Sequence, residues 1–289
     1  MKRRKHLINL WRVFLIGVLA TLLPQTAGAW EGSGTTSYDP YLIKSIADMT
    51  QLANDVNGGE TYAGKFFALV ENLEYTGTEN NYIPIGSNTN NFCGHFDGCG
   101  KTIKGIRYTS DTNDYIGLFG YVQGGYVMNV RLDDCQFFST KASSSHVATI
   151  GYCNYPDDEI FGITVNNCVF SAKNGYAGGI VGYSFAKIKY CTVENTTITV
   201  MDGITLQGKA GGIAADYEAF GCSNNTVRDC TIKGGHAAGI IGHSATTSEV
   251  NNNIVEDCTI IGDVSAAGIS SNSVANAHPT PHQNNIVVG

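Results

Sequence analysis

Histidines, carboxylates and basic side chains are the residues of this 289-residue chain that could carry out catalysis, and few of them lie near one another in sequence. Asp133-Asp134 is an acidic pair of the kind that glycoside hydrolysis uses, and His243, in Gly242-His243-Ser244, could assist such a pair. The two elements are several sequence repeats apart, however, and no Arg-x-Lys follows the histidine. We therefore interpret both as turn and edge residues, and we predict no catalytic residue for this chain.

Metal-dependent chemistry would need several ligands close together. A calcium-dependent lyase needs a number of acidic oxygens beside a base. Asp157-Asp158-Glu159 is the densest acidic run, and we interpret it as a solvated insertion loop, with weak calcium binding as the alternative. A zinc-protease motif of the His-Glu-x-x-His type is absent, and the prolines around His278 and His282 prevent a helical pairing of these histidines. We predict no metal and no cofactor.

The nine cysteines follow a pattern that argues against a disulfide framework. One position of a V-x-x-C-x-I type segment recurs at steps of 33, 28, 34 and 28 residues, and is occupied by Cys135, Cys168, Thr196, Cys230 and Cys258. A small, apolar-tolerant side chain at this spacing predicts an inward stack of free thiols. Cys93 and Cys99 lie off this pattern and are the better candidates for a disulfide, if the chain forms one.

A short Gly-apolar motif recurs six times along the chain. The candidate residues above must therefore be positioned by a repeated structural unit. The copies of the motif are GLFG at 117–120, TIGY at 149–152, GIVG at 179–182, GIAA at 212–215, GIIG at 239–242 and GISS at 268–271. Successive copies are separated by 31, 31, 33, 27 and 29 residues. A period of this size predicts a solenoid, whose units bury their apolar faces against one another.

The residue types inside the unit favour a parallel β-helix. β-branched residues, Gly and Asn dominate, and no heptad or leucine-rich pattern is present. Asn clusters at 224–225, 251–253 and 284–285 suit left-handed turns and can stack in hydrogen-bonded ladders. We therefore predict an all-β fold in which each unit is one coil. A β-propeller is the alternative, although its blades need about forty residues.

Three further segments are predicted around and within the array. Residues 30–40 are interpreted as a linker, residues 41–110 as an N-terminal capping segment, and residues 111–289 as the repeats, continuous with the cap as one domain. Within the cap, Ser45 and Asp48 fit a helix start, and the amphipathic run that follows ends at a pair of glycines. We expect this helix to cover the open end of the array.

The first 29 residues are predicted to be a cleaved secretory signal peptide. A basic start, an apolar run at 14–23 and Ala27-Gly28-Ala29 follow one another in the order that such a signal requires. The apolar run is about half the length of a membrane span, so we expect no membrane insertion of the mature chain. We therefore expect the protein to be secreted or displayed at the cell surface.

The net charge of the mature chain indicates which classes of partner it can bind. Removing residues 1–29 takes away five of the 18 basic residues, which leaves 13 Lys plus Arg against 25 Asp plus Glu and a net charge near −12. Such a surface repels phosphate backbones, so nucleic acid is not expected as a partner. Host or matrix proteins and glycans remain, and the sequence leaves the oligomeric state open.

The repeats also resemble a known family. GLFGYV, GGIVGY and AGIIGH resemble the GLUG motif of bacterial exported and cell-surface proteins, and SIADMTQLANDVNGG, KFFALVENL, YIPIG and FDGCGKTIKGI are similar to the leader that accompanies such repeats in Bacteroidetes-type proteins. The resemblance extends over residues 41–289, although Cys99 stands where Asn is usual, and GIAA and GISS lack the second Gly. It implies a right-handed β-helix of the pectin-lyase-like type and a secreted or surface, adhesin-like role. It supplies no catalytic residue, because the motif is structural.

Two classes of function follow from these observations. The leading hypothesis is a non-enzymatic, exported β-helix binding module that presents loops to host, matrix or glycan ligands. The alternative is a carbohydrate-active β-helix enzyme, a polysaccharide lyase or hydrolase, which would require Asp, Glu and a base to meet from adjacent coils. A passenger fragment of a larger surface protein is a third possibility.

Overall fold

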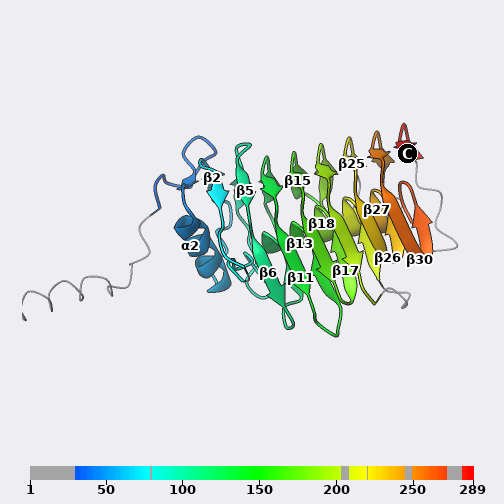
Figure 1. Cartoon of the computed structure of the whole chain (residues 1–289). Coiled ribbons are helices and arrows are strands. Elements are labelled where there is room, and N and C mark those ends of the chain that lie inside the picture. The colour runs from blue at the N-terminus through cyan, green and yellow to red at the C-terminus, as the bar shows by residue number, and fades with distance from the viewer. Residues whose placement is uncertain (1–29, 79, 203–207, 220, 245–248, 272–281) are drawn as a thin grey trace, which may run out of the picture. The chain divides into compact units, whose positions relative to one another are not determined.

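The computed structural model describes residues 30–78, 80–202, 208–219, 221–244, 249–271 and 282–289. Residues 31–289 form one compact unit, a parallel β-solenoid of about eight turns. Figure 1 shows the strands of successive turns side by side, beginning next to helix α2 and ending at β30 and the C-terminal strands. The predicted all-β parallel β-helix is therefore confirmed. The predicted signal peptide lies outside the described residues, and the domain boundaries stay predictions.

Four sheets run along the solenoid, because each strand pairs in parallel with the equivalent strand of the next turn. Sheet 1 contains β1 (Tyr41–Ile43), β2 (Phe66–Leu69), β4 (His95–Asp97), β9 (Tyr126–Met128), β14 (Glu159–Phe161), β19 (Lys187–Lys189), β24 (Cys222–Ser223), β28 (Val250–Asn251) and β31 (His282–Gln283). Sheet 2 contains β3 (Leu73–Glu74), β5 (Thr102–Lys104), β10 (Arg131–Asp133), β15 (Thr164–Asn166), β20 (Thr192–Glu194), β25 (Thr226–Arg228), β29 (Ile254–Glu256) and β32 (Ile286–Val288).

The other two sheets carry the segments around the Gly-apolar motif. Sheet 3 contains β6 (Arg107–Ser110), β11 (Gln136–Ser139), β16 (Val169–Ala172), β21 (Thr197–Val200), β26 (Thr231–Ala238), β22 (Lys209–Gly211), β17 (Gly175–Gly178), β12 (Ser145–Val147) and β7 (Tyr115–Ile116), with β30 (Thr259–Ala267) paired to β26. Sheet 4 contains β8 (Phe119–Val122), β13 (Ile150–Cys153), β18 (Val181–Ser184), β23 (Ala214–Tyr217) and β27 (Ile241–Ser244). One turn, such as β9 to β13, therefore uses five strands.

Helix α2 (Ile46–Asn57) forms as predicted. The Ser45 hydroxyl accepts a hydrogen bond from the Asp48 backbone N–H at 3.3 Å, which caps the helix. The residues of its buried face are Met49, Leu52, Ala53 and Val56. Ile46, which was expected on the same face, lies at the edge of it and is 36% exposed. No helix in the described part of the chain is long and apolar enough to cross a bilayer.

Two corners of each turn share one local structure, a left-handed residue followed by a buried side chain. Between sheets 1 and 2 the non-glycine residues with positive φ include Asn129, Tyr190, Asn224, Asn252 and Asn284. Between sheets 2 and 3 they are Asp134, Asn167, Asn195, Asp229 and Asp257. Asn and Asp adopt this conformation at lower cost than other residues with a side chain, which explains why they recur once per turn.

At the first corner, asparagine side chains form a ladder along the solenoid. The Asn225 backbone N–H donates to Asn253 Oδ1 at 3.0 Å, and the Asn253 N–H donates to Asn285 Oδ1 at 2.9 Å. The Asn253 amide in turn donates to the carbonyl of Cys222 at 3.0 Å. Asn225 and Asn253 are fully buried, so these bonds replace the water that their backbone would otherwise need. The predicted ladder is therefore confirmed.

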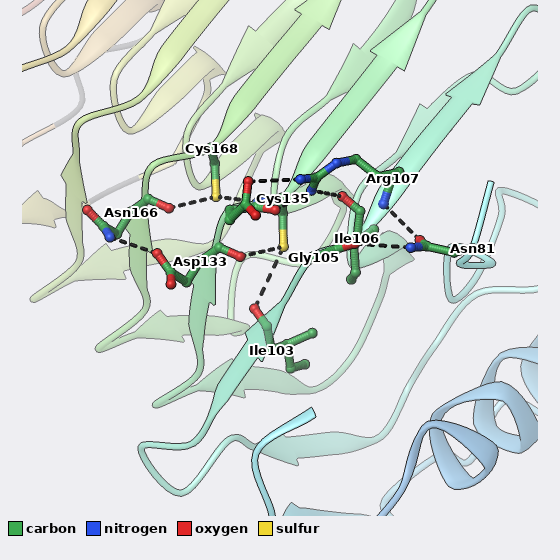
Figure 2. Close-up of polar contacts among 10 residues, drawn as sticks. Asn81, Ile103, Gly105, Ile106, Arg107, Asp133, Cys135, Asn166 and Cys168 are labelled. Carbon is green, nitrogen blue, oxygen red and sulfur yellow. Dashed lines mark hydrogen bonds and ion pairs between the residues drawn. The ribbon is translucent and has the colours of Figure 1, made fainter. Parts of the chain in front are cut away.

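At the second corner, thiols take the position that asparagine occupies at the first (Figure 2). The Cys135 N–H donates to Cys168 Sγ at 3.3 Å, and Cys168 Sγ donates to the Asn166 carbonyl at 3.1 Å. The Cys168 N–H donates to Thr196 Oγ1 at 3.3 Å, so threonine continues the column. The predicted inward stack is confirmed by the burial of Cys135, Cys168, Thr196 and Cys230. Cys258, in the last turns, is partly exposed.

All nine cysteines lie in the described ranges, and all are free thiols. The disulfide considered for Cys93 and Cys99 is therefore not formed. Cys93 Sγ donates instead to Asn91 Oδ1 at 2.9 Å, and Cys99 is exposed. Three cysteines that the sequence pattern had not placed are fully buried in the core: Cys153, Cys191 and Cys222.

The asparagine ladder yields a test of what holds the turns together. Asn253→Ala should lower the free energy of unfolding by about 2–4 kcal/mol, because it leaves the Asn225 backbone N–H buried without a partner and removes the side-chain bond to the Cys222 carbonyl. Asn252→Gly, one residue earlier at a positive φ of 57°, should change stability by less than about 0.5 kcal/mol. Urea unfolding followed by circular dichroism measures both. Similar losses in the two variants would contradict the ladder's role.

Candidate functional site

Outward-facing side chains form two parallel columns where sheet 3 meets sheet 4. Paired strands in register place Tyr115, His146 and Tyr176 in one column, from β7, β12 and β17. The same register places Tyr121, Tyr152 and Tyr183 in the other, from β8, β13 and β18. The neighbours of these residues along each strand are buried, so the strand alternation directs the rings outward. We call these six residues the aromatic stripe.

The rings of the aromatic stripe contact one another both along and across the columns. Tyr152 stacks on Tyr121 with ring centroids 4.8 Å apart and on Tyr183 at 4.9 Å. His146 stacks on Tyr176 at 4.5 Å and meets Tyr152 edge-on at 5.6 Å. Because stacking covers the ring faces, the stripe presents ring edges and phenolic hydroxyls to its surroundings.

The second glycine of the Gly-apolar motif brings the two columns together. A Cβ on Gly182 would lie 2.5 Å from the Gly151 carbonyl oxygen and 2.9 Å from the Cβ of His146. Both distances are shorter than van der Waals contact, so a side chain there would push the sheets apart. The second glycine therefore allows the strands of sheet 4 to pass close to the outward residues of sheet 3.

Burial further favours the uncharged forms of the residues in the aromatic stripe. It lowers the pKa of His146 to about 4, and the imidazole is therefore neutral. It raises the pKa of Tyr152 to about 12, with a smaller contribution from neighbouring Tyr121. The pKa of Tyr183 is raised by burial and by its hydrogen bond to Glu218, whose Oε1 lies 2.5 Å from the hydroxyl.

Charged residues replace the rings where the columns continue into the next turns. The first column continues with Lys209 and His236, and the second with Asp216 and His243. Lys209 Nζ lies 2.5 Å from Asp216 Oδ2, and His243 Nδ1 lies 2.8 Å from Asp216 Oδ1. We call these four residues the ionic end of the stripe. Asp216 is 2% exposed, and both of its oxygens are occupied by partners.

The structure separates the two elements that resembled a hydrolase site. His243 meets Asp216, and lies in sheet 4, whereas Asp133 and Asp134 lie at the corner between sheets 2 and 3. Asp133 accepts a hydrogen bond from the Asn166 amide at 2.7 Å (Figure 2), and Asp134 pairs with a guanidinium. Sequence spacing did not reveal the Asp216–His243 pair, because the two residues come from different turns.

The acidic run at 157–159 differs from its predicted state. Asp157 and Glu159 are exposed, but Asp158 is only 3% exposed, so the prediction of a solvated loop was wrong for this residue. Asp158 Oδ2 accepts a hydrogen bond from the Gly124 N–H at 3.0 Å, which draws the side chain under the loop. Burial raises the pKa of this carboxyl to about 6.

No cluster of metal ligands occurs within the described ranges, where three or more His, Cys, Asp or Glu side chains would have to meet. His278 lies outside the described residues. The aromatic stripe itself was missed by sequence reasoning, although a signal existed. A tyrosine directly follows Gly120, Gly151 and Gly182, which are the last glycines of three copies of the motif.

Comparison with known proteins supports the repeat. The family model described as the GLUG motif matches residues 173–199, which include the GIVG copy and strands β17 and β18. The chain therefore contains a GLUG motif within a β-solenoid. The match includes Tyr176 and Tyr183, which are the last residues of the two columns of the aromatic stripe.

Two further similarities extend beyond the motif. Over 142 residues the chain is 32% identical to a protein of Evansella cellulosilytica named "Putative Gly-rich membrane protein". The alignment covers 46% of this chain and 16% of that protein, so the chain spans about a sixth of the relative it matches. The structure is also similar to a crystal structure of a "putative immunoglobulin A1 protease" from Bacteroides ovatus, with a TM-score of 0.65 at 21% identity over 92% of this chain and 80% of the other. At that identity the likeness shows the solenoid fold.

The buried carboxyl of Asp158 predicts a specific pH dependence. Between the pKa of an unfolded aspartate, about 3.9, and a folded value of about 6, the native chain binds a proton that the unfolded chain has lost. The free energy of unfolding should therefore fall as pH rises through this window. We expect Asp158 to contribute about 1–2 kcal/mol of this fall, after allowance for solvent screening at the open side of the loop.

Asp158→Asn isolates this contribution, because an amide oxygen can still accept the Gly124 hydrogen bond but does not titrate. Urea unfolding of both proteins at pH 4, 5, 6 and 7 should show the variant gaining stability relative to the wild type as pH rises. Parallel curves for the two proteins across this window would show that the carboxyl titrates normally.

Proposed function

We propose that this chain is an exported, non-enzymatic β-helix module that binds an extended neutral glycan of a host or matrix along the aromatic stripe, in the manner of an adhesin. The observation that carries the proposal is the pair of stacked columns itself. Three successive turns present a pair of aromatic rings at strand spacing, so a ligand that repeats along its own length meets a similar surface at each step.

The chemistry of the aromatic stripe supports a neutral glycan over charged ligands. The rings are uncharged at neutral pH, since His146 is held neutral and the tyrosines stay protonated. Phenolic hydroxyls both donate and accept hydrogen bonds, which matches the hydroxyl groups of a sugar chain. The mature chain's net charge near −12 repels polyanions.

Surface display is part of the same proposal. The predicted signal peptide directs the chain out of the cytoplasm, and the Evansella relative is named as a membrane protein. Because the aligned region is a small part of that relative, display on a longer surface protein is compatible with binding by this module.

The aromatic stripe provides the direct test. Tyr152→Ala with Tyr183→Ala should weaken binding to glycans identified on an array by about tenfold or more, measured by titration calorimetry. Phe at both positions keeps the rings and removes the hydroxyls, and should weaken binding less. Tyr38→Ala is the matched control, because Tyr38 is 98% exposed and distant in the chain. A wild type that binds no glycan, or double variants that bind as well as the control, would refute the proposal.

A carbohydrate-active or proteolytic enzyme is the second candidate, and the ionic end of the stripe is the observation that favours it. Lys209, Asp216 and His243 come from three strands of adjacent turns, which is the convergence that catalysis requires. The neighbour from Bacteroides ovatus is named as a protease of immunoglobulin A1.

The enzyme hypothesis is tested by an activity assay. Incubation of the wild type with pectin, alginate, glycosaminoglycans and immunoglobulin A1 should release no new reducing ends, unsaturated ends or protein fragments, because both Asp216 oxygens are already bound to partners. Release that Asp216→Asn abolishes, while the variant keeps its thermal midpoint, would establish an enzyme instead of a binding module.

A further inference from the structure

A polar cavity lies at the N-terminal end of the aromatic stripe. Its volume is about 370 Å³, within the range of small-molecule sites. Tyr115, the first residue of the stripe's first column, forms part of its wall. The cavity and the stripe are therefore one continuous surface at this residue.

Three segments distant in sequence build the cavity. They are the end of α2 at Asn57, the segment 83–88, and the loop 112–115 that leads into β7. Asn57 joins the first two, because its amide donates to the Pro84 carbonyl at 3.0 Å and its Oδ1 accepts from the Gly86 N–H at 3.0 Å. Isolated pairing of Ile85 with Phe119 holds the second segment beside sheet 4.

The third segment is fixed by short-range hydrogen bonds. The Asn113 amide donates to the Tyr108 hydroxyl at 2.7 Å, and the Asn113 N–H donates to Ser110 Oγ at 3.0 Å. The carboxylate of Asp114 is paired with the ammonium of Lys141. The wall is thus positioned before any ligand arrives, which reduces the entropy that binding costs.

The lining favours one class of ligand. Amides of Asn57, Asn88 and Asn113, hydroxyls and one carboxylate alternate with the rings of Tyr108 and Tyr115. No basic residue lines the cavity, so it offers nothing to balance a phosphate, sulfate or carboxylate group. Several hydrogen-bonding groups beside apolar ring surface match a sugar, which carries hydroxyls around an apolar C–H face.

We propose that this cavity is a subsite for the terminal residue of a glycan, a neutral pyranose, whose chain continues along the aromatic stripe. The inference rests on the proposed function, which it deepens by adding an end-specific site. It assigns a direction to the bound chain, because the cavity lies at the Tyr115 end of the stripe, whereas the opposite end carries the charged residues Lys209 and Asp216. The module then recognises the end of a glycan and not only its interior.

Monosaccharides test the cavity separately from the stripe. The full mature chain is titrated with glucose, galactose, mannose and N-acetylglucosamine, and binding is followed by amide chemical-shift changes. At least one of the four should shift residues 83–88 and 112–115. Asn88→Trp fills the cavity from an exposed position whose side chain makes no hydrogen bond within the described part of the chain, and should weaken this binding about tenfold or more. Thr89→Trp, one residue outside the lining, is the matched control and should bind as the wild type does.

The same variants separate the two proposals. Asn88→Trp should retain weakened binding to the longer glycan, whereas alanine at Tyr152 and Tyr183 should weaken that binding about tenfold or more and leave the monosaccharide shifts intact. Glycan binding that is lost with the stripe variants but unchanged in Asn88→Trp would overturn the subsite alone. Absence of any shift with all four sugars, or equal shifts in the Asn88 and Thr89 variants, would also overturn it.

Discussion

The capping of backbone groups at two corners of every turn is the interaction on which the rest of this fold depends. A left-handed residue turns the chain, and the residue after it must enter the core with its backbone N–H directed at the next turn. The side chain of the next turn accepts a hydrogen bond from this N–H. Asn253 accepts it with its amide oxygen, and Cys168 accepts it with its sulfur at 3.3 Å. Sulfur is a weaker acceptor than an amide oxygen, but a thiol brings less polar surface into the core. Both choices keep each turn directly above the last, and this exact stacking is what places like residues in columns.

The aromatic stripe is a consequence of the same register on the outer surface. Once Tyr152 lies between Tyr121 and Tyr183, ring stacking follows from the spacing of paired strands, about 4.8 Å. The glycine before each tyrosine removes the side chain that would separate sheets 3 and 4. Structural repetition and a potential binding surface are therefore produced by one short sequence motif. The stripe ends where Lys209 and Asp216 replace the rings, although the backbone register continues.

The side chains that point into the solenoid core could be predicted from sequence, because burial restricts the residue type at each of their positions. Cys135, Cys168 and Thr196 share small size, and the asparagine clusters share a turn conformation, so both columns are visible as periodic patterns. The side chains that point outward could not be predicted in the same way. Solvent allows tyrosine, histidine, lysine or aspartate at one column position, and the loops between strands vary in length. The pairing of His243 with Asp216 and the burial of Asp158 depend on these loop lengths, and so required coordinates.

Our preference for a binding module over an enzyme rests on how the polar groups of the stripe are already used. A carboxylate that acts directly on a substrate must keep an oxygen or a proton available for it. Asp216 has neither, because one oxygen faces the Lys209 ammonium and the other faces the His243 ring. The tyrosine hydroxyls and the amides around Asn113 retain hydrogen-bonding capacity, since each of these groups both donates and accepts. The proposed binding of a neutral glycan is consistent with this use of polar groups, in which charged side chains pair with one another and neutral groups stay available.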